Sequence, residues 1–450
     1  MACRVSLGQL IEILDATPVN LTAAALSQRA IGVVTDSRHL QPGEVFLALR
    51  GDRFDGHGFV PTVIQQGAIA AIVDRADDQA QLPLLWVKDT LQAYQAIAHW
   101  WRNQFKIPVI AITGSVGKTT TKELVAAVLA TQGSVLKTQA NYNNEIGVPK
   151  TLLELEPSHD YAVIEMGMRA AGEIVLLTQI ARPDIALITN VGTAHIGILG
   201  SEQAIANAKC ELLQQLQPTG TAILNQDNDR LIRTAAEVWQ GKTITYGLEG
   251  GDLQGEWVDA ATLRVDGIDF KLPLPGRHNA LNYLAALAVA KALQINWESL
   301  TQELSVEMPK GRSHRRELPH DIVILDETYN AGLESMIASL HLLAETPAKR
   351  RIAVLGTMKE LGDRSPEFHH QVGVAAQQLN LDALLILADA AESQAMAAGA
   401  GSLPTEQFSS HDEVVERLRE TMQSGDRILF KASRAVGLDQ VVEELLKNAR

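Results

Sequence analysis

The sequence has few cysteines, no long apolar run and fewer basic than acidic residues. Cys3 and Cys210 are its only cysteines and lie far apart, which excludes a disulfide framework and a four-cysteine zinc site. We interpret both as unpaired thiols of a reducing cytosol. No apolar run approaches the roughly 20 residues that span a bilayer, and Glu12 and Asp15 interrupt the region where a signal sequence would lie. We therefore expect a soluble, cytoplasmic protein without membrane insertion.

The shortage of positive charge restricts the partners. Lysine and arginine number 39 against 53 acidic residues, so the formal net charge is −14. Such a chain is a poor binder of polyanions, which excludes nucleic acid and anionic membranes and requires any phosphate site to be built locally. A hydrophobic content of 46% with 20% charged residues excludes disorder as the main state. At roughly 150 residues per domain, 450 residues predict about three domains.

Strands and helices alternate along the chain, which predicts an α/β fold with doubly wound sheets. In residues 1–105 we expect strands at Val45–Leu49 and Ala68–Val73 and a helix at Leu91–Phe105. In residues 106–315 we expect strands at Ile107–Thr113, Tyr161–Met166, Ile185–Thr189 and Thr221–Leu224, and helices at Glu123–Thr131 and Glu202–Leu216. Residues 316–450 repeat the alternation, with strands at Ile322–Asp326, Ile352–Gly356, Leu384–Ala388 and Ile428–Lys431.

A glycine-rich loop follows the first strand of the middle segment and opens a helix. It consists of Gly114, Ser115, Val116, Gly117, Lys118, Thr119 and Thr120. Glycines allow a tight turn in which successive N–H groups point at phosphate oxygens, and the helix N-terminus adds a positive dipole. We expect Lys118 to contact the β- and γ-phosphates and the Thr119 hydroxyl to bind Mg²⁺. The order of strand, loop and helix favours a nucleoside triphosphate site over an ordinary β–α turn, although Ile112 replaces the first glycine of the longer pattern.

Three further side chains are candidates for the same edge of the sheet. Glu165 ends a predicted strand and His195 follows the next one, and ligands of α/β sheets bind at that edge. A carboxylate beside the loop suits Mg²⁺. Taken alone, the position of Glu165 fits an exposed carboxylate at a strand end equally well. The position of His195 likewise fits a structural histidine held by hydrogen bonds. Lys209 lies in a helical stretch, and its spacing does not distinguish a functional lysine from a solvated one.

Longer motifs resemble those of one family, the Mur ligases, which form amide bonds with ATP in peptidoglycan synthesis. Gly114–Thr120 with Lys122 resembles the GxxGKTTTK loop, and Asn141–Pro149 is similar to the NxNNxIGVP stretch of the D-alanyl-D-alanine-adding branch. The resemblance continues at Glu165–Arg169, Asn190–His195, Gly276–Asn282, Gly311–Arg312, Asp326–Ala331, Leu355–Gly362 and Lys431–Arg434, and in the first segment at Thr35–Arg38, Phe46–Gly51 and Asp55–His57. The DNPR-type signature of the diaminopimelate-adding branch is not found.

The resemblance implies a three-domain Mur ligase architecture with a central P-loop ATPase-like doubly wound sheet and a C-terminal Rossmann-like domain. Residues 1–105 would bind the UDP-substrate, residues 106–315 ATP, and residues 316–450 the D-Ala-D-Ala acceptor. The implied reaction adds D-Ala-D-Ala to UDP-MurNAc-tripeptide through an acyl phosphate formed with ATP and Mg²⁺, in a monomer. Diaminopimelate and lysine both remain open as the third residue of the tripeptide.

The resemblance also implies roles for individual residues. Lys118, Glu165, His195 and Lys209 would be catalytic. One Mg²⁺ would be held by Thr119 and Glu165, and a second by His195 and a carbamylated Lys209, since carbamylation gives the amine carboxylate-like oxygens. The nucleotide would be held by Asn144 and Asn282 at adenine, Asp326 at ribose and Arg312 at phosphate. Ser37 and the loop around His57 would face the UDP, and Asn330, Lys431, Ser433 and Arg434 would bind the dipeptide substrate.

Several positions depart from the family pattern. Glu327 stands where Asp is usual, Gly332-Leu333 where Asn-Pro is usual, Thr357 where Asp is usual, Ala432 where Gly is usual, and Cys210 follows the helix lysine in place of Gly. Most lie in the third segment and bear on dipeptide recognition. Two alternatives therefore stay open: a sister amide ligase, similar to the diaminopimelate-adding or folylpolyglutamate-forming enzymes, and an inactive nucleotide-binding scaffold. Retention of both metal positions argues against the scaffold.

Overall fold

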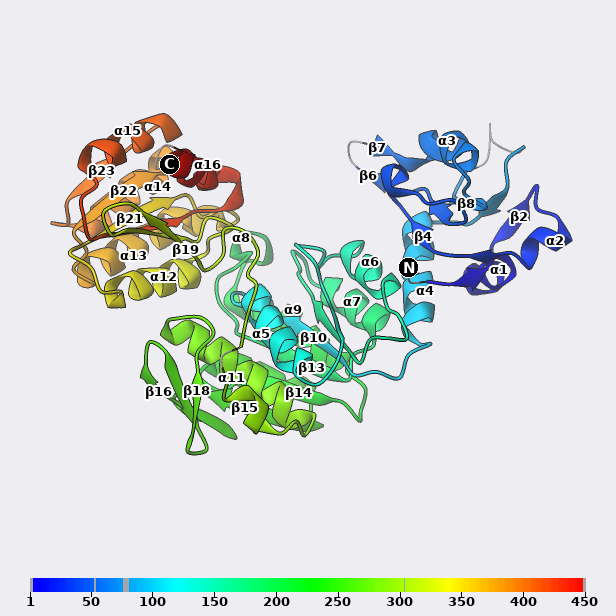
Figure 1. The fold of residues 1–450 in the computed structure, drawn as a ribbon, viewed down its shortest axis with the longest axis horizontal. Helices are drawn as coiled ribbons and strands as arrows, with labels where there is room; N and C mark the ends of the chain where they lie inside the picture. The colour runs from blue at the N-terminus through cyan, green and yellow to red at the C-terminus, as the bar shows by residue number, and fades with distance from the viewer. Residues whose placement is uncertain (1–2, 52–53, 76–80, 303, 448–450) are drawn as a thin grey trace.

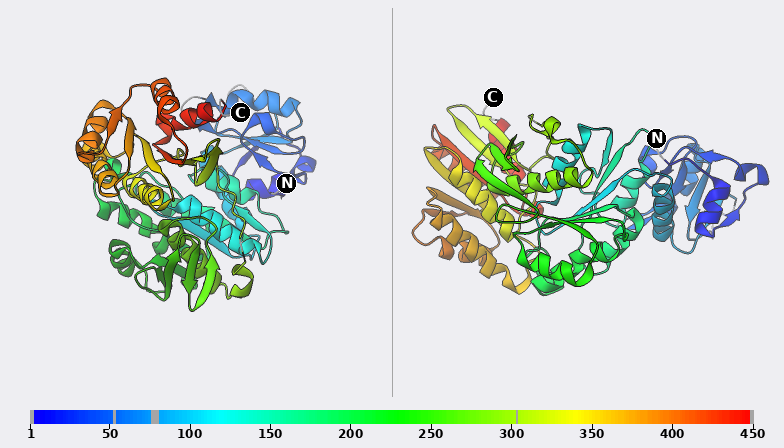
Figure 2. Two further views of the ribbon diagram at one scale, coloured as in Figure 1. Left: turned by 60° about the vertical axis from the view of Figure 1, so that its left-hand side comes forward. Right: turned by 90° about the horizontal axis from the view of Figure 1, so that it is seen from below.

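Three large β-sheets follow one another along the chain, each covered by helices (Figure 1), and the described residues also form two two-stranded sheets, β1 (Val5–Ser6) with β3 (Arg29–Ala30) and β6 (Arg50–Gly51) with β7 (Phe54–Asp55). The structure, a computed structural model, describes residues 3–51, 54–75, 81–302 and 304–447. The first and third segments lie on opposite sides of the middle segment in Figure 1 and in the right-hand view of Figure 2. Within the described residues, no helix is long and apolar enough to cross a membrane.

The first sheet has five strands in the order β2-β9-β8-β5-β4. Their bounds are β2 Thr17–Val19, β4 Val33–Val34, β5 Val45–Leu47, β8 Ala70–Val73 and β9 Leu84–Trp86. Helix α4, Thr90–Arg102, connects this sheet to the middle segment. On α4, the Trp101 Nε1 donates to the Leu155 carbonyl at 3.1 Å and the Arg102 Nε to the Ala181 carbonyl at 3.0 Å, so the helix is fixed to the middle segment.

The middle sheet has nine strands in the order β11-β12-β10-β13-β14-β15-β16-β17-β18. The strands up to β16 are parallel, and their bounds are β10 Val109–Thr113, β11 Val135–Lys137, β12 Tyr161–Glu165, β13 Ile185–Ile188, β14 Thr221–Asn225, β15 Lys242–Gly247 and β16 Leu253–Asp259. Side chains of β10 alternate between two cores: Ile110 and Ile112 face the core with α5 (Lys118–Ala130) and α11 (Arg277–Ala292), whereas Ala111 faces the core with α7 (Glu173–Ala181) and α9 (Glu202–Gln214). The sheet is therefore doubly wound, with helices on both faces.

The third sheet has six strands in the order β19-β20-β24-β21-β22-β23. Their bounds are β19 His314–Leu318, β20 Ile322–Asp326, β21 Arg350–Gly356, β22 Ala383–Leu387, β23 Thr405–Gln407 and β24 Asp426–Lys431. Helices α12 (Leu333–Glu345), α13 (Ser365–Gln378) and α14 (Ala390–Ala400) cover one face, and α15 (His411–Thr421) and α16 (Leu438–Lys447) the other. The five strands β20, β24, β21, β22 and β23 are parallel, and β19 is an antiparallel edge strand.

Every strand predicted from an apolar run forms, with ends that shift by at most two residues, and the α/β class is confirmed. Helix α5 begins at Lys118, five residues before the predicted start, because Gly117 with φ of +81° turns the chain directly into it. The structure adds an antiparallel extension, β16 with β17 (Thr262–Val265) and β18 (Ile268–Lys271), that the prediction of parallel strands missed. These strands are short and exposed on one side, so they lack the apolar runs that identified the others.

Candidate active site

The glycine-rich loop lies between β10 and α5 with its backbone tightly packed. Gly114 has φ of +154°, and a Cβ there would lie 1.9 Å from the Thr189 Oγ1. A Cβ on Gly117 would lie 2.7 Å from the Asn282 Oδ1. The Lys118 Nζ donates to the Gly114 carbonyl at 2.7 Å and so folds back over the loop. Burial lowers the pKa of Lys118, and Arg312 adds to this while Glu165 opposes it.

Two of the loop N–H groups are occupied by protein partners, which corrects the expectation of a run of free donors. The Ser115 N–H donates to the Asn190 carbonyl at 3.1 Å and the Val116 N–H to the Asn190 Oδ1 at 3.0 Å. The first N–H groups of α5, which begins at Lys118, have no partner within the helix. The anion-binding donors are therefore those of Lys118, Thr119 and Thr120, together with the helix dipole.

Glu165 lies beside the loop at the end of β12, where its backbone pairs with Ile112 of β10. Its side chain is only 2% exposed. The Asn143 Nδ2 donates to its Oε1 at 2.7 Å, and the Thr138 Oγ1 accepts from its backbone N–H at 2.9 Å. Its Oε2 is buried without a hydrogen-bond partner among the described residues. A buried, unpartnered carboxylate oxygen is a donor atom available to a cation.

His195 and Lys209 come from consecutive elements after β13. His195 caps α8, Ile196–Leu199, with φ of +66°. Its Nδ1 lies 2.5 Å from the Glu360 Oε2, which belongs to the third segment. The close contact with His195, together with the charges of His195 and Arg169, holds the pKa of Glu360 below its usual value. The helix α9 carries Lys209, which is only 1% exposed.

Lys209 has the most strongly perturbed amine of the site. Burial, and then the positive charge of Lys118, place the pKa of Lys209 well below its usual value. Among the described residues, we find no hydrogen bond or ion pair that engages its Nζ. The environment of Lys209 therefore favours the neutral amine.

These residues fit divalent cations of the Mg²⁺ type. The described residues contain no group of three or more His, Cys, Asp and Glu side chains that could hold a metal ion. A site for such a cation would therefore need further oxygens, for which the Thr119 hydroxyl, a carbamate on Lys209 and the nucleotide phosphates are the candidates. The unpartnered Oε2 of Glu165 fits this donor set, because Mg²⁺ takes one or two carboxylates and completes its shell with phosphate and water.

Two cationic side chains lie near the loop: Arg312, at the end of the middle segment, and Lys431, which ends β24 of the third sheet. Arg312 stacks on the Tyr329 ring at 4.1 Å from its centroid, and its Nε is buried without a hydrogen-bond partner. Lys431, only 4% exposed, donates from Nζ to the Asn330 carbonyl at 3.0 Å. Burial, and then Arg312, lower the pKa of Lys431, while Glu327 opposes this. Clustered buried cations of this kind attract an anion, such as a phosphate.

The remaining predicted nucleotide residues have other partners in this structure. Asn144 is exposed, and its Oδ1 accepts from the Gly147 N–H at 2.9 Å. Asn282 accepts at Oδ1 from the Thr121 hydroxyl at 3.2 Å and lies against the loop. Asp326, 3% exposed, accepts from the Thr328 hydroxyl at 2.7 Å. Their contacts to adenine and ribose stay predictions.

The remaining residues that were predicted to bind the dipeptide lie in two loops. Ser433 and Arg434 follow β24, and Asn330 follows β20. The Ser433 Oγ accepts from the Lys359 N–H at 2.9 Å, which joins this loop to the one after β21. Arg434 is exposed and pairs with Asp439 at 3.1 Å. Asn330 is exposed as well, so its side chain and that of Arg434 are accessible to a ligand.

In the first segment, His57 is enclosed. It is only 2% exposed, with its Nδ1 2.7 Å from Asp55 and its Nε2 3.0 Å from Asp74. The two aspartates in turn pair with Arg75 and Arg50. Both ring nitrogens of His57 thus have protein partners, and its contact with a UDP moiety stays a prediction. Ser37, half-buried, begins the short η1 helix Ser37–His39 and stays a predicted contact.

Sequence reasoning missed three residues that contact the predicted ones. Asn143 binds Glu165, and Glu360 binds His195. Glu334, on α12, accepts from the Thr193 N–H at 2.7 Å and from its hydroxyl at 3.2 Å. Asn143 adjoins the predicted Asn144, so its motif could have indicated it. The two glutamates come from the third segment, and nothing in their local sequence predicts contact with the middle segment.

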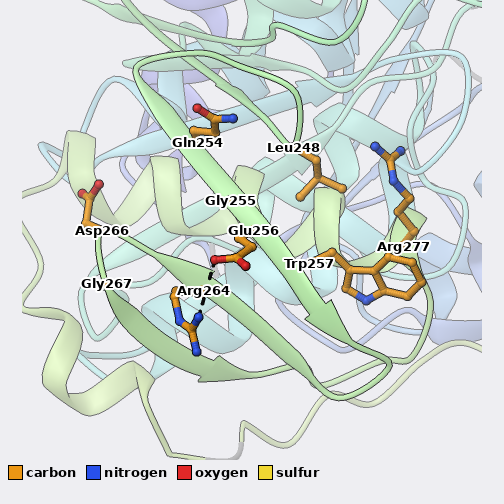
Figure 3. Close-up of a pocket in the computed structure, with 9 residues that line it drawn as sticks. All are labelled: Leu248, Gln254, Gly255, Glu256, Trp257, Arg264, Asp266, Gly267 and Arg277. Atoms are coloured by element: carbon orange, nitrogen blue, oxygen red, sulfur yellow. Dashed lines mark ion pairs between the residues drawn. The ribbon is translucent and has the colours of Figure 1, made fainter.

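The open pocket on the β16–β18 extension is separate from this site (Figure 3). Its lining includes Trp257, Arg277 and the Arg264–Glu256 ion pair at 3.5 Å. None of the residues predicted from the sequence to be functional lies in it. Cys3 and Cys210 are both free and buried, which confirms the prediction of unpaired thiols, and burial raises the pKa of each to about 12.

The fold and the loop define a three-domain Mur ligase. Residues 30–102 match the family pattern described as "Mur ligase family, catalytic domain". Residues 112–290 match the "Mur ligase middle domain", and residues 311–434 the "Mur ligase, glutamate ligase domain". Matches to all three patterns in chain order are consistent with the three sheets.

More specifically, the chain belongs to the family of MurF ligases. It is 55% identical to the UDP-N-acetylmuramoyl-tripeptide–D-alanyl-D-alanine ligase of a Synechocystis strain, over 99% of this chain and 98% of that protein. A crystal structure of MurF from Acinetobacter baumannii is 32% identical, with a TM-score of 0.89 and coverage of 99% of both chains. MurF from Thermotoga maritima, solved in complex with ADP, is 31% identical with a TM-score of 0.83, over 93% of this chain and 97% of that one.

Proposed function

We propose that this ligase joins D-alanyl-D-alanine to UDP-MurNAc-tripeptide at the expense of ATP, as the last cytoplasmic step in making the peptidoglycan pentapeptide precursor. The observation that supports this most strongly is similarity to MurF ligases over nearly the whole chain. The chain also has Lys118, Glu165, His195 and Lys209 at the positions that resemble the family motifs. We further propose that residues 1–105 hold the UDP-substrate, 106–315 ATP and 316–450 the dipeptide, and that the enzyme acts as a monomer.

The chemistry requires two anions to meet. A terminal carboxylate oxygen of the tripeptide attacks the γ-phosphorus, and the bond to ADP breaks. The amine of the dipeptide then attacks the acyl carbon of the acyl phosphate, loses a proton, and inorganic phosphate leaves. Lys118 and the N-terminus of α5 would hold the phosphates. Arg312, at the end of the ATP domain, and Lys431 of the third domain would add positive charge.

Bound Mg²⁺ would supply charge neutralisation and alignment of phosphate and carboxylate oxygens. Thr119 and Glu165 would hold one ion, and His195 with a carbamylated Lys209 the other. The carbamate forms when the neutral Lys209 amine adds CO₂ and releases a proton, and the buried environment of this lysine supports that step. Water must be kept from the acyl phosphate, which requires the domains to close on the substrates.

A phosphate-release assay tests the proposal. Purified enzyme is given ATP, Mg²⁺ and UDP-MurNAc-tripeptide, with and without D-Ala-D-Ala. Phosphate release that needs the dipeptide supports the proposal. Release that needs another amine would identify a sister ligase, and no release with any amine would identify a scaffold. Parallel assays with diaminopimelate- and lysine-containing tripeptides determine the third residue.

A further inference from the structure

One carboxylate of the third domain contacts a proposed metal ligand of the middle domain. Glu360 lies in the loop after β21, and its Oε2 is 2.5 Å from the His195 Nδ1. The loop is held in place by its backbone as well, since the Gly197 N–H donates to the Glu360 carbonyl at 3.1 Å. Gly362 packs so closely on Gly197 that a Cβ on Gly362 would lie 2.9 Å from the Gly197 Cα.

Both residues of this pair have strained backbones. His195 has φ of +66° and Glu360 has φ of +65°, in the left-handed region that Gly and Asn tolerate better than His or Glu. Strain of this kind persists where the surrounding structure imposes it and is concentrated at functional sites. At position 360, a glycine or asparagine would relax the backbone, but neither would offer a carboxylate. The presence of Glu there points to a use for its charge.

We propose that Glu360 is a positioning residue that orients His195 for metal binding, an inference that rests on the proposed function. A carboxylate on Nδ1 keeps the proton at that nitrogen and leaves Nε2 as the unprotonated ligand atom. Carboxylate partners of this kind fix the tautomer and raise the basicity of metal-binding histidines. Because Glu360 belongs to the third domain, the second metal site is complete only when that domain is docked. Binding of the second metal and docking are thereby coupled.

The competing explanation is that Glu360 only latches the two domains together. Glu334 makes another interdomain contact, through Thr193, so a latch exists independently of His195. A double-mutant cycle separates the two explanations, because positioning acts through His195 whereas latching does not.

The experiment measures Mn²⁺ binding by the full chain, by electron paramagnetic resonance with ADP and bicarbonate present. The variants are Glu360→Asn, Glu360→Asp, His195→Asn and the double variant Glu360→Asn with His195→Asn. Asparagine adopts the left-handed backbone at position 360 more readily than glutamate does. We therefore expect the melting temperature of Glu360→Asn to equal or exceed that of the wild type. Glu367→Gln is the control, because Glu367 pairs with Arg364 within the third domain at 2.8 Å.

We expect Glu360→Asn to raise the Mn²⁺ concentration for half-saturation about 10- to 100-fold, with Glu360→Asp between it and the wild type. In the His195→Asn background the same change should have less than about a twofold effect. Equal effects in both backgrounds, no effect in either, or Mn²⁺ binding that His195→Asn leaves unchanged would overturn the proposal. The titration contains neither tripeptide nor dipeptide, so its outcome is distinct from failure of the proposed ligase activity.

Discussion

The middle and third domains contribute to one site in different ways. The middle domain supplies residues from the ends of adjacent parallel strands and the helices that follow them: Lys118 after β10, Glu165 at the end of β12, and His195 and Lys209 after β13. The third domain supplies residues from a helix start, a loop and a strand end that are far apart in the chain: Glu334, Glu360 and Lys431. The first set is fixed by the topology of one sheet. The second depends on how two domains meet.

We interpret the first set as the residues of the chemical step and the second set as residues that make this step depend on domain docking. Residues fixed within one sheet are expected to keep their geometry whether or not the third domain is docked, although the ribose contact predicted for Asp326 would come from the third domain. We expect transfer of phosphate to a carboxylate to need the cations and the Glu360 contact as well. Damage to the first set is therefore expected to abolish catalysis, and damage to the second to weaken it.

The largest effect is expected at Lys209, in the middle domain. Lys209→Ala removes the amine that would be carbamylated and should lower kcat about 10³-fold. Short carboxylates such as formate, added in bicarbonate-free buffer, should restore part of the activity by replacing the carbamate oxygens. Lys242→Ala, at an exposed lysine of the same domain, serves as control and should leave kcat unchanged. Full activity of Lys209→Ala without rescue would contradict the carbamate role.

Gly117 tests the packing of the loop against α11. Gly117→Ala places a Cβ 2.7 Å from the Asn282 Oδ1 at a position with φ of +81°, and should raise KM for ATP about 10- to 100-fold. Gly267→Ala is a matched control, since its φ is +79° but no heavy atom lies within 4 Å of the added Cβ. Both variants share the backbone strain, so a difference in KM reports the contact with Asn282. Equal KM values would show that this contact is unimportant.

Apolar runs identify buried parallel strands, and the sequence predicted such strands in all three domains. Val109–Thr113 and Tyr161–Glu165 are continuous runs with few polar interruptions, and both formed strands as predicted. The β17 and β18 strands are half-exposed, and strand β23, Thr405–Gln407, is short and polar, so neither carries that signal. Their position is decided by pairing with a neighbouring strand, which a single segment does not reveal.

Prediction of the site from the sequence has the same limit. Motifs beside Gly117 and Glu165 were recognisable because one loop and one strand end place them. Glu334 and Glu360 escaped prediction because their partners lie 141 and 165 positions away in the chain, in another domain. For His57, the motif was visible but its enclosure by Asp55 and Asp74 was not, since Asp74 follows a different strand. Local patterns indicate residue types, and contacts between domains decide their partners.

Within the third domain, Glu327 offers a milder test. Its Oε1 accepts from the Ser313 N–H at 3.0 Å, and its Oε2 lies 4.0 Å from the Lys431 Nζ. Glu327→Asp restores the residue usual in the family but shortens the side chain by one methylene. Loss of one such hydrogen bond should raise KM for D-Ala-D-Ala about fivefold, with little change in KM for ATP. Glu317→Asp, at an exposed position on β19, is the control. A lower KM in Glu327→Asp would show that Glu327 hinders dipeptide binding in this chain.

The smallest effect concerns stability where the two domains meet. Burial, and then the nearby charge of Lys431, lower the pKa of His278 on α11 from 6.5 to about 4. Between these values the unfolded chain binds more protons at this position than the folded one, so the stability contribution is complete above about pH 6.5 and is lost as pH falls toward 4. The full shift corresponds to about 3 kcal/mol, and since the ring is only half-buried we expect about 1–2 kcal/mol.

Urea unfolding of wild type and His278→Gln at pH 7 and pH 4.5 measures this stability contribution, because the effects of the other titrating groups cancel in the difference. The wild type should lose that much more stability than the variant on acidification, and equal losses would place His278 in a solvated environment that does not depend on the third domain.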